Sequence, residues 1–148
     1  MTKEFSVIQL EDWEKVAVFL RDQLTAPTIL ALSGPLGAGK TTLVQALART
    51  LGVVDRPRSP TFSLLRTYSL PTPVNSIKRL VHIDAYRLDQ PSDIHALDLA
   101  GELSEPGTIV AIEWAEQLGE TLKVFNVPVF HLVIEPKEGT ERLVKIHL

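Results

Sequence analysis

The sequence lacks cysteine altogether, so it can form neither disulfides nor thiolate metal sites. It also lacks any apolar run approaching the roughly 20 residues that span a bilayer, and we expect neither a membrane segment nor a membrane partner. The first residues carry an early acidic pair and no long apolar stretch, which is unlike a signal peptide. These absences favour a cytoplasmic protein.

The chain has no excess of positive charge, because its 15 Lys and Arg are outnumbered by 18 Asp and Glu, for a net charge of −3. A protein that grips nucleic acid through its own phosphate contacts is usually basic, at least on one face. If this chain acts on nucleic acid, we therefore expect a partner to hold it. The 148 residues, 45% hydrophobic, suffice for a single domain over 1–148 with a core of its own.

The apolar pattern predicts an α/β layered domain with a mixed, mostly parallel sheet and antiparallel hairpins. The expected helices are residues 11–24, 40–51 and 92–103. The expected strands are residues 28–33, 61–70, 79–86, 108–114, 130–135 and 142–147. We expect one hairpin to turn around Pro71 to Asn75 and a second hairpin to turn at Gly139.

Residues 34–42 read GPLGAGKTT and match the Walker A pattern, with a buried strand before them and a helix after them. A loop of small residues lets backbone N–H groups approach a phosphate, and the helix adds the positive end of its dipole. Lys40 would bring an ammonium group to the phosphates, and Thr41 would offer a hydroxyl to Mg²⁺. The pattern predicts a P-loop NTPase-like three-layer domain that binds a nucleoside triphosphate with Mg²⁺. The expected nucleotide-binding residues of the loop are Gly34, Pro35, Leu36, Gly37, Ala38, Gly39, Lys40, Thr41 and Thr42. Thr42 either contacts the nucleotide or simply begins the helix.

Two acidic residues lie near the ends of predicted strands and are candidates for the metal site and for catalysis. Asp84 ends the segment LVHID, and Glu113 follows four apolar residues, as in a Walker B strand. One acid could bind the metal and the other could orient water, and the sequence leaves open which does which. His82 shares a strand face with Asp84, so it either orients that carboxylate or only packs in the hairpin. Trp114 either stacks near the nucleotide or only packs.

Four segments in this order and spacing, GPLGAGKTT at 34–42, SPTF at 59–62, HIDAYRL at 82–88 and IEW at 112–114, closely resemble the TsaE (YjeE) family. The resemblance covers nearly the whole chain. It implies a bacterial P-loop ATPase, using ATP and Mg²⁺, that serves formation of threonylcarbamoyladenosine (t6A) in tRNA. Such proteins bind the TsaD–TsaB heterodimer, reset it between turnovers and reach tRNA only through that complex. We expect slow turnover by the isolated chain, as a monomer or weak oligomer.

Residue by residue, the resemblance assigns Lys40 to phosphates and catalysis, Thr41 to phosphates and Mg²⁺, and Asp84 and Glu113 to metal binding or catalysis. The resemblance also places three further residues near the nucleotide or near a switch segment that senses the γ-phosphate: Thr42, Thr61 and Trp114. The family commonly has an acidic second loop residue where this chain has Pro35, and we expect little effect on ATP binding.

Three alternatives remain beside an ATPase. A GTPase is disfavoured, because the D-x-x-G match at 98–101 lies in a helical segment and no N-K-x-D pattern is present. A small-molecule kinase would need an arginine-rich lid, which the sequence does not show. A binding module gated by ATP occupancy, with little turnover, differs from the ATPase mainly in rate.

Overall fold

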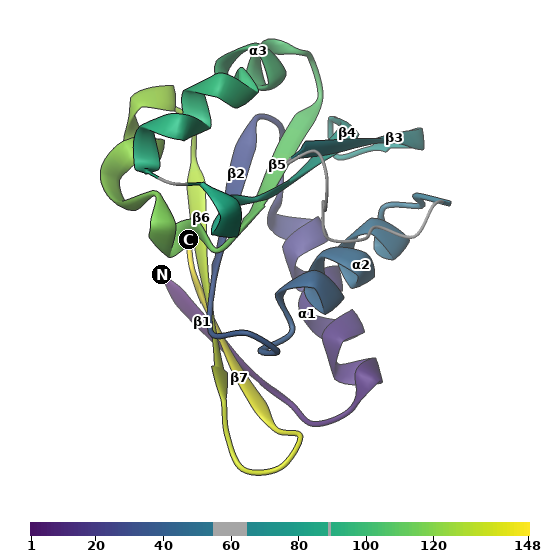
Figure 1. Cartoon of the computed structure of the whole chain (residues 1–148). Helices are drawn as coiled ribbons and strands as arrows, with labels where there is room; N and C mark the ends of the chain where they lie inside the picture. Colours follow the sequence, from purple (N-terminus) through teal and green to yellow (C-terminus); the bar gives the residue numbers. More distant parts are fainter. Residues whose placement is uncertain (55–64, 89) are drawn as a thin grey trace.

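The computed structural model describes residues 1–54, 65–88 and 90–148, and these form an α/β domain around one sheet (Figure 1). The strands are β1 (Thr2–Val7), β2 (Thr28–Ser33), β3 (Leu65–Val74), β4 (Ile77–Asp84), β5 (Thr108–Glu113), β6 (Val129–Pro136) and β7 (Arg142–His147). The α-helices are α1 (Leu10–Gln23), α2 (Lys40–Thr50) and α3 (Leu99–Ser104). The short 3₁₀ helices are η1 (Ala85–Arg87), η2 (Pro91–Leu97), η3 (Ala115–Gln117) and η4 (Gly119–Phe125).

Within the described residues the sheet has seven strands in the order β1-β7-β6-β2-β5-β4-β3. Its four central strands, β6, β2, β5 and β4, pair in parallel, whereas β1, β7 and β3 pair antiparallel at the two sides. Every residue of β5 is buried, and so is every residue of β2 except the last, which explains their continuous apolar sequences. The mixed α/β sheet is confirmed, with parallel pairing confined to its centre.

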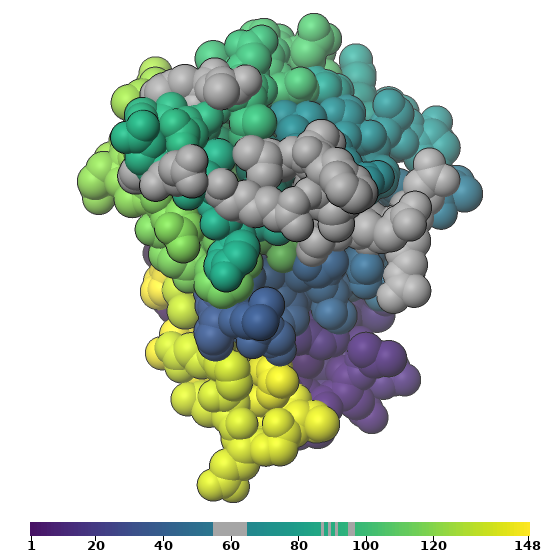
Figure 2. All heavy atoms as spheres, in the orientation of Figure 1, coloured from purple at the N-terminus to yellow at the C-terminus, as the bar shows by residue number. Residues whose placement is uncertain are grey.

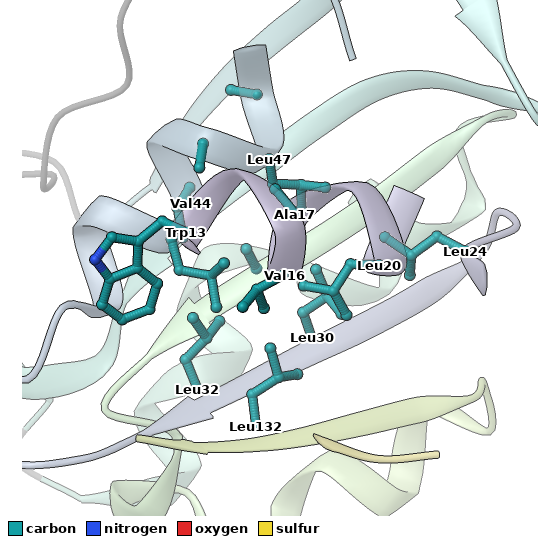
Figure 3. Packing of buried hydrophobic residues seen from close by; sticks show 14 of the residues in the cluster. Trp13, Val16, Ala17, Leu20, Leu24, Leu30, Leu32, Val44, Leu47 and Leu132 are labelled. Atoms are coloured by element: carbon teal, nitrogen blue, oxygen red, sulfur yellow. The ribbon is translucent and has the colours of Figure 1, made fainter. Parts of the chain in front are cut away.

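Two hydrophobic clusters, one on each face of the sheet, make the domain three-layered. Helices α1 and α2 cover one face, where Trp13, Val16 and Leu20 of α1 pack toward Leu30 of β2 and Leu132 of β6 (Figure 3). Helix α3 and the 3₁₀ helices cover the opposite face (Figure 1). No helix among the described residues has the length and apolar character needed to cross a membrane.

The beginning of α1 is held by a capping box, as its acidic first turn favours. The Asp12 carboxylate accepts hydrogen bonds from the backbone N–H of Ile8 (2.9 Å) and Gln9 (3.1 Å). These two bonds are the main cause of a lowered pKa for Asp12. The charged form of Asp12 therefore stabilises the start of this helix.

The first hairpin differs from the prediction in the position of its turn and in the end of its second strand. Strand β3 continues through the expected turn to Val74, and the chain reverses at Asn75 and Ser76, which both have positive φ (48° and 71°). Strand β4 ends at Asp84 rather than at residue 86, because the Asp84 carboxylate accepts a hydrogen bond from Tyr86 N–H (2.9 Å) and caps η1. The expected strand residues 61–64 lie outside the described residues.

The predicted single helix over residues 92–103 is wrong, and strand β1 was not predicted. Asp98 has a left-handed backbone (φ 50°) and divides the segment into η2 and α3, where its carboxylate caps α3 by accepting from Gly101 N–H. Strand β1 pairs antiparallel with β7. The C-terminal hairpin of β6 and β7, with its positive φ (60°) at Gly139, is confirmed.

Candidate functional site

The glycine-rich loop joins the central strand β2 to the first residue of α2, as predicted. Gly39 precedes α2 with φ 113°, a conformation that favours glycine. The indole ring of Trp13 lies directly against it, because a Cβ on Gly39 would meet Trp13 Cζ2 at 2.5 Å. Helix α1 thus supports the loop through one aromatic side chain, and only glycine fits at the contact.

Lys40 is held over the loop by its own backbone and by an aromatic ring. Its Nζ donates to the carbonyl oxygens of Gly34 (2.5 Å) and Pro35 (3.0 Å) and lies 3.9 Å from the ring centroid of Trp114. Burial lowers the pKa of Lys40, and the nearby carboxylates, that of Glu116 first among them, oppose this shift. The neighbouring carboxylates therefore favour the charged form of Lys40, and its partial removal from water strengthens the attraction of the ammonium group for an anion.

The carboxylate of Glu113 connects the loop to the sheet. Its Oε1 accepts a hydrogen bond from Thr41 Oγ1 (2.7 Å), and its Oε2 lies 2.5 Å from Nε2 of His82. Asp84 is opposite Glu113 in the β4–β5 register, so the two acids end neighbouring parallel strands. This edge, beyond the carboxyl ends of parallel strands, is where open α/β sheets bind ligands.

A pocket of 350 Å³ opens at this edge of the sheet. Its lining residues are Leu36, Gly37, Ala38, Gly39, Lys40, Thr41, Thr42, Asp84, Tyr86, Glu113 and Trp114. In Figure 2 the loop (blue, near the centre) forms part of the molecular surface. The rings of Tyr86 and Trp114 contact each other at 4.9 Å between centroids and form one wall of the pocket.

Comparison with known proteins shows to which family the chain belongs. The TsaE family, described as "Threonylcarbamoyl adenosine biosynthesis protein TsaE", matches residues 7–144. The chain belongs to the TsaE family. The resemblance that the motifs suggested is thereby confirmed.

Individual proteins that are similar in sequence to this TsaE family member support the same family assignment. A Nostoc protein is 39% identical over 122 residues, which are 80% of this chain and 70% of the relative. An Aquifex aeolicus protein is 36% identical over 119 residues, which are 79% and 80% of the two chains. Both relatives are named tRNA threonylcarbamoyladenosine biosynthesis protein TsaE. The crystal structure of Bacillus subtilis YdiB is similar in fold, with a TM-score of 0.69 at 22% identity over 99% of this chain and 84% of the other.

Most of the predicted site residues of this TsaE family member converge on the pocket. The loop from Leu36 to Thr42 lines it together with Asp84, Glu113 and Trp114. Gly34 and Pro35 do not line the pocket, but their carbonyl groups hold Lys40. Thr61 and its SPTF segment lie outside the described residues. Which residues contact a nucleotide stays a prediction.

Sequence reasoning missed three side chains at the site of this TsaE family member. Trp13 lies in the predicted helix 11–24 and Tyr86 in the HIDAYRL segment, but neither had an assigned role at the site. Glu116 accepts a hydrogen bond from Gly34 N–H (3.1 Å) and so ties η3 to the start of the loop. The only sign of this role in the sequence is that Glu116 lies three residues after Glu113. An acidic residue in a short segment after a strand is usually solvated, so this sign was not decisive.

The oxygen atoms at the pocket suit a hard cation. Thr41 Oγ1 and Glu113 Oε1 already contact each other, and Asp84 ends the neighbouring strand. Among the described residues, no three His, Asp or Glu side chains form a complete metal-ligand group. Mg²⁺ keeps several waters and commonly uses one or two carboxylates plus substrate phosphates, so this donor set fits it.

Proposed function

We propose that this TsaE family member binds ATP with Mg²⁺ and hydrolyses it in the service of t6A formation in tRNA. The observation that carries the proposal is the meeting of Lys40, Thr41 and Glu113 in one pocket at the ends of parallel strands. The family and its named relatives supply the pathway.

The residues of the pocket divide into complementary roles. The loop N–H groups and the Lys40 cation bind and orient the triphosphate. Thr41 and Glu113 hold the metal as a pair, because their oxygens already lie together. When bound, Mg²⁺ supplies neutralisation of phosphate charge. Asp84, at the end of the neighbouring strand, is left to orient the attacking water.

A partner would complete the site. Leu36 and Tyr86, both on the pocket lining, are 88% and 59% exposed, so they present apolar and aromatic surface directly beside the site. We expect the TsaD–TsaB heterodimer to cover this rim, exclude water and accelerate turnover, which resets the heterodimer. The net charge of −3 supports contact with tRNA through that complex rather than directly.

Two substitutions test the proposal. Lys40→Ala should abolish ATP binding measured by calorimetry, because the loop loses its cation. Lys123→Ala is the matched control, since Lys123 is exposed on η4 and lies outside the pocket lining. Unchanged affinity in Lys40→Ala would refute the nucleotide site.

Glu113→Ala should keep binding through the loop but lose most ATP turnover, measured as phosphate release. Glu120→Ala, which removes an exposed carboxylate on η4, is its control. Normal turnover by Glu113→Ala would reject the role of Glu113 in metal binding or catalysis.

A further inference from the structure

His82 is a fully buried polar side chain that lies directly behind the candidate metal site. It belongs to β4, where Asp84 follows it by two residues on the same strand face, and its exposed fraction is 0%. His82 does not line the pocket, so it cannot contact a ligand there. Any influence it has on the site must pass through a neighbouring residue.

That neighbour is Glu113, whose two carboxylate oxygens have different partners. Oε2 faces His82 Nε2 at 2.5 Å, whereas Oε1 accepts from Thr41 at 2.7 Å. The carboxylate belongs to a residue that is 3% exposed, so little water is available to replace a lost partner. The contact with His82 therefore holds the carboxylate of Glu113 in an orientation that turns one of its oxygens toward Thr41.

The surroundings of the imidazole also indicate its tautomer. Within the described part of the chain, His82 Nδ1 has no hydrogen-bond partner. A proton on Nδ1 would be an unpaired buried donor, which is costly, whereas a proton on Nε2 can be donated to the carboxylate. The favoured tautomer thus carries its proton on Nε2, which donates to Glu113 Oε2.

We propose that His82 is a positioning residue that orients the Glu113 carboxylate toward Thr41 and so preorganises the site for Mg²⁺. The inference rests on the proposed function, because it takes Glu113 and Thr41 as the metal-facing pair. Outer-shell partners of this kind typically contribute about 10–100-fold to metal affinity.

Asparagine and glutamine at position 82 form a matched pair for the test. Both are neutral amides, but the longer glutamine places its NH₂ group near the position of Nε2, whereas the asparagine NH₂ group falls near Nδ1 and cannot reach Glu113. Affinity for a non-hydrolysable ATP analogue is measured by calorimetry with Mg²⁺ and, separately, with EDTA. His82→Asn should lower the affinity in Mg²⁺ by about 10–100-fold and leave the affinity in EDTA close to that of wild type. His82→Gln should retain most of the effect of Mg²⁺.

Equal behaviour of the two variants, or an equal loss with and without Mg²⁺, would overturn the role of His82. Absence of nucleotide binding in the wild-type protein would instead overturn the proposed function. Nuclear magnetic resonance of the ligand-free protein tests the contact independently of nucleotide and metal binding. The ¹⁵N spectrum should place the His82 proton on Nε2, with a shift that changes in Glu113→Gln; a proton on Nδ1 would contradict the inference.

Discussion

Gly39→Ala should destabilise the protein where the loop meets α1, and the structure gives the size of the effect. With φ at 113°, an alanine would occupy a left-handed conformation that costs an L-residue about 1–2 kcal/mol. Its Cβ would also lie 2.5 Å from Cζ2 and 2.7 Å from Cη2 of Trp13, a residue that is only 6% exposed. Overpacking of this kind costs about 1–3 kcal/mol, so the free energy of unfolding should fall by about 2–5 kcal/mol.

Gly37→Ala is the matched control, because Gly37 also has positive φ (77°) but a Cβ there would meet no atom of the described residues within 4 Å beyond its chain neighbours. Its free energy of unfolding should fall only by the cost of the left-handed backbone conformation, about 1–2 kcal/mol. Urea titrations followed by far-UV circular dichroism measure both variants. Trp13→Phe, which shortens the ring, should recover part of the loss in the Gly39→Ala background. Equal destabilisation by the two alanines would refute the claim that Trp13 supports the loop.

Three further substitutions test other contacts. Trp114→Leu removes the ring above Lys40 and should lower the free energy of unfolding by about 0.5–2 kcal/mol in urea titrations; an unchanged value would reject this cation–π contact. Asp12→Asn tests pH dependence. Because the folded-state pKa of Asp12 lies below 3.8, its contribution is complete above that pH and is lost as the pH falls through the folded value. The stability difference between wild type and Asp12→Asn should therefore shrink in acid, and a constant difference would contradict the assignment. Arg79→Met breaks the partly buried ion pair with Glu102 (2.5 Å), and a double-mutant cycle with Glu102→Gln in urea titrations should show favourable coupling rather than additivity.

The sequence predicted best those elements whose hydrophobic pattern reflects their burial. Strands β2 and β5 are buried along almost their whole length, and α1 buries one face, so their patterns were unambiguous. Strand β1 was missed because four of its six residues are exposed and its only buried residue is Val7. The break at Asp98 was missed because a left-handed aspartate leaves no mark on hydrophobic periodicity.

For the site, the local loop motif was predictable but the contacts made by distant residues were not. The sequence placed Asp84 and Glu113 near strand ends, and the parallel β4–β5 register then makes them neighbours. His82 had two possible roles, and only that pairing shows that its partner is Glu113. Trp13 meets Gly39 through the packing of α1 on α2, which depends on the whole fold.

The central claim is that this TsaE family member turns over ATP as part of the t6A machinery. The most direct measurement is phosphate release from ATP with Mg²⁺, by the protein alone and with TsaD–TsaB and tRNA, using Glu113→Ala throughout as the control. The account predicts slow release by the isolated protein, clear acceleration in the full mixture and loss of that acceleration in the variant. Equal release with and without the partners, or normal acceleration by Glu113→Ala, would contradict it.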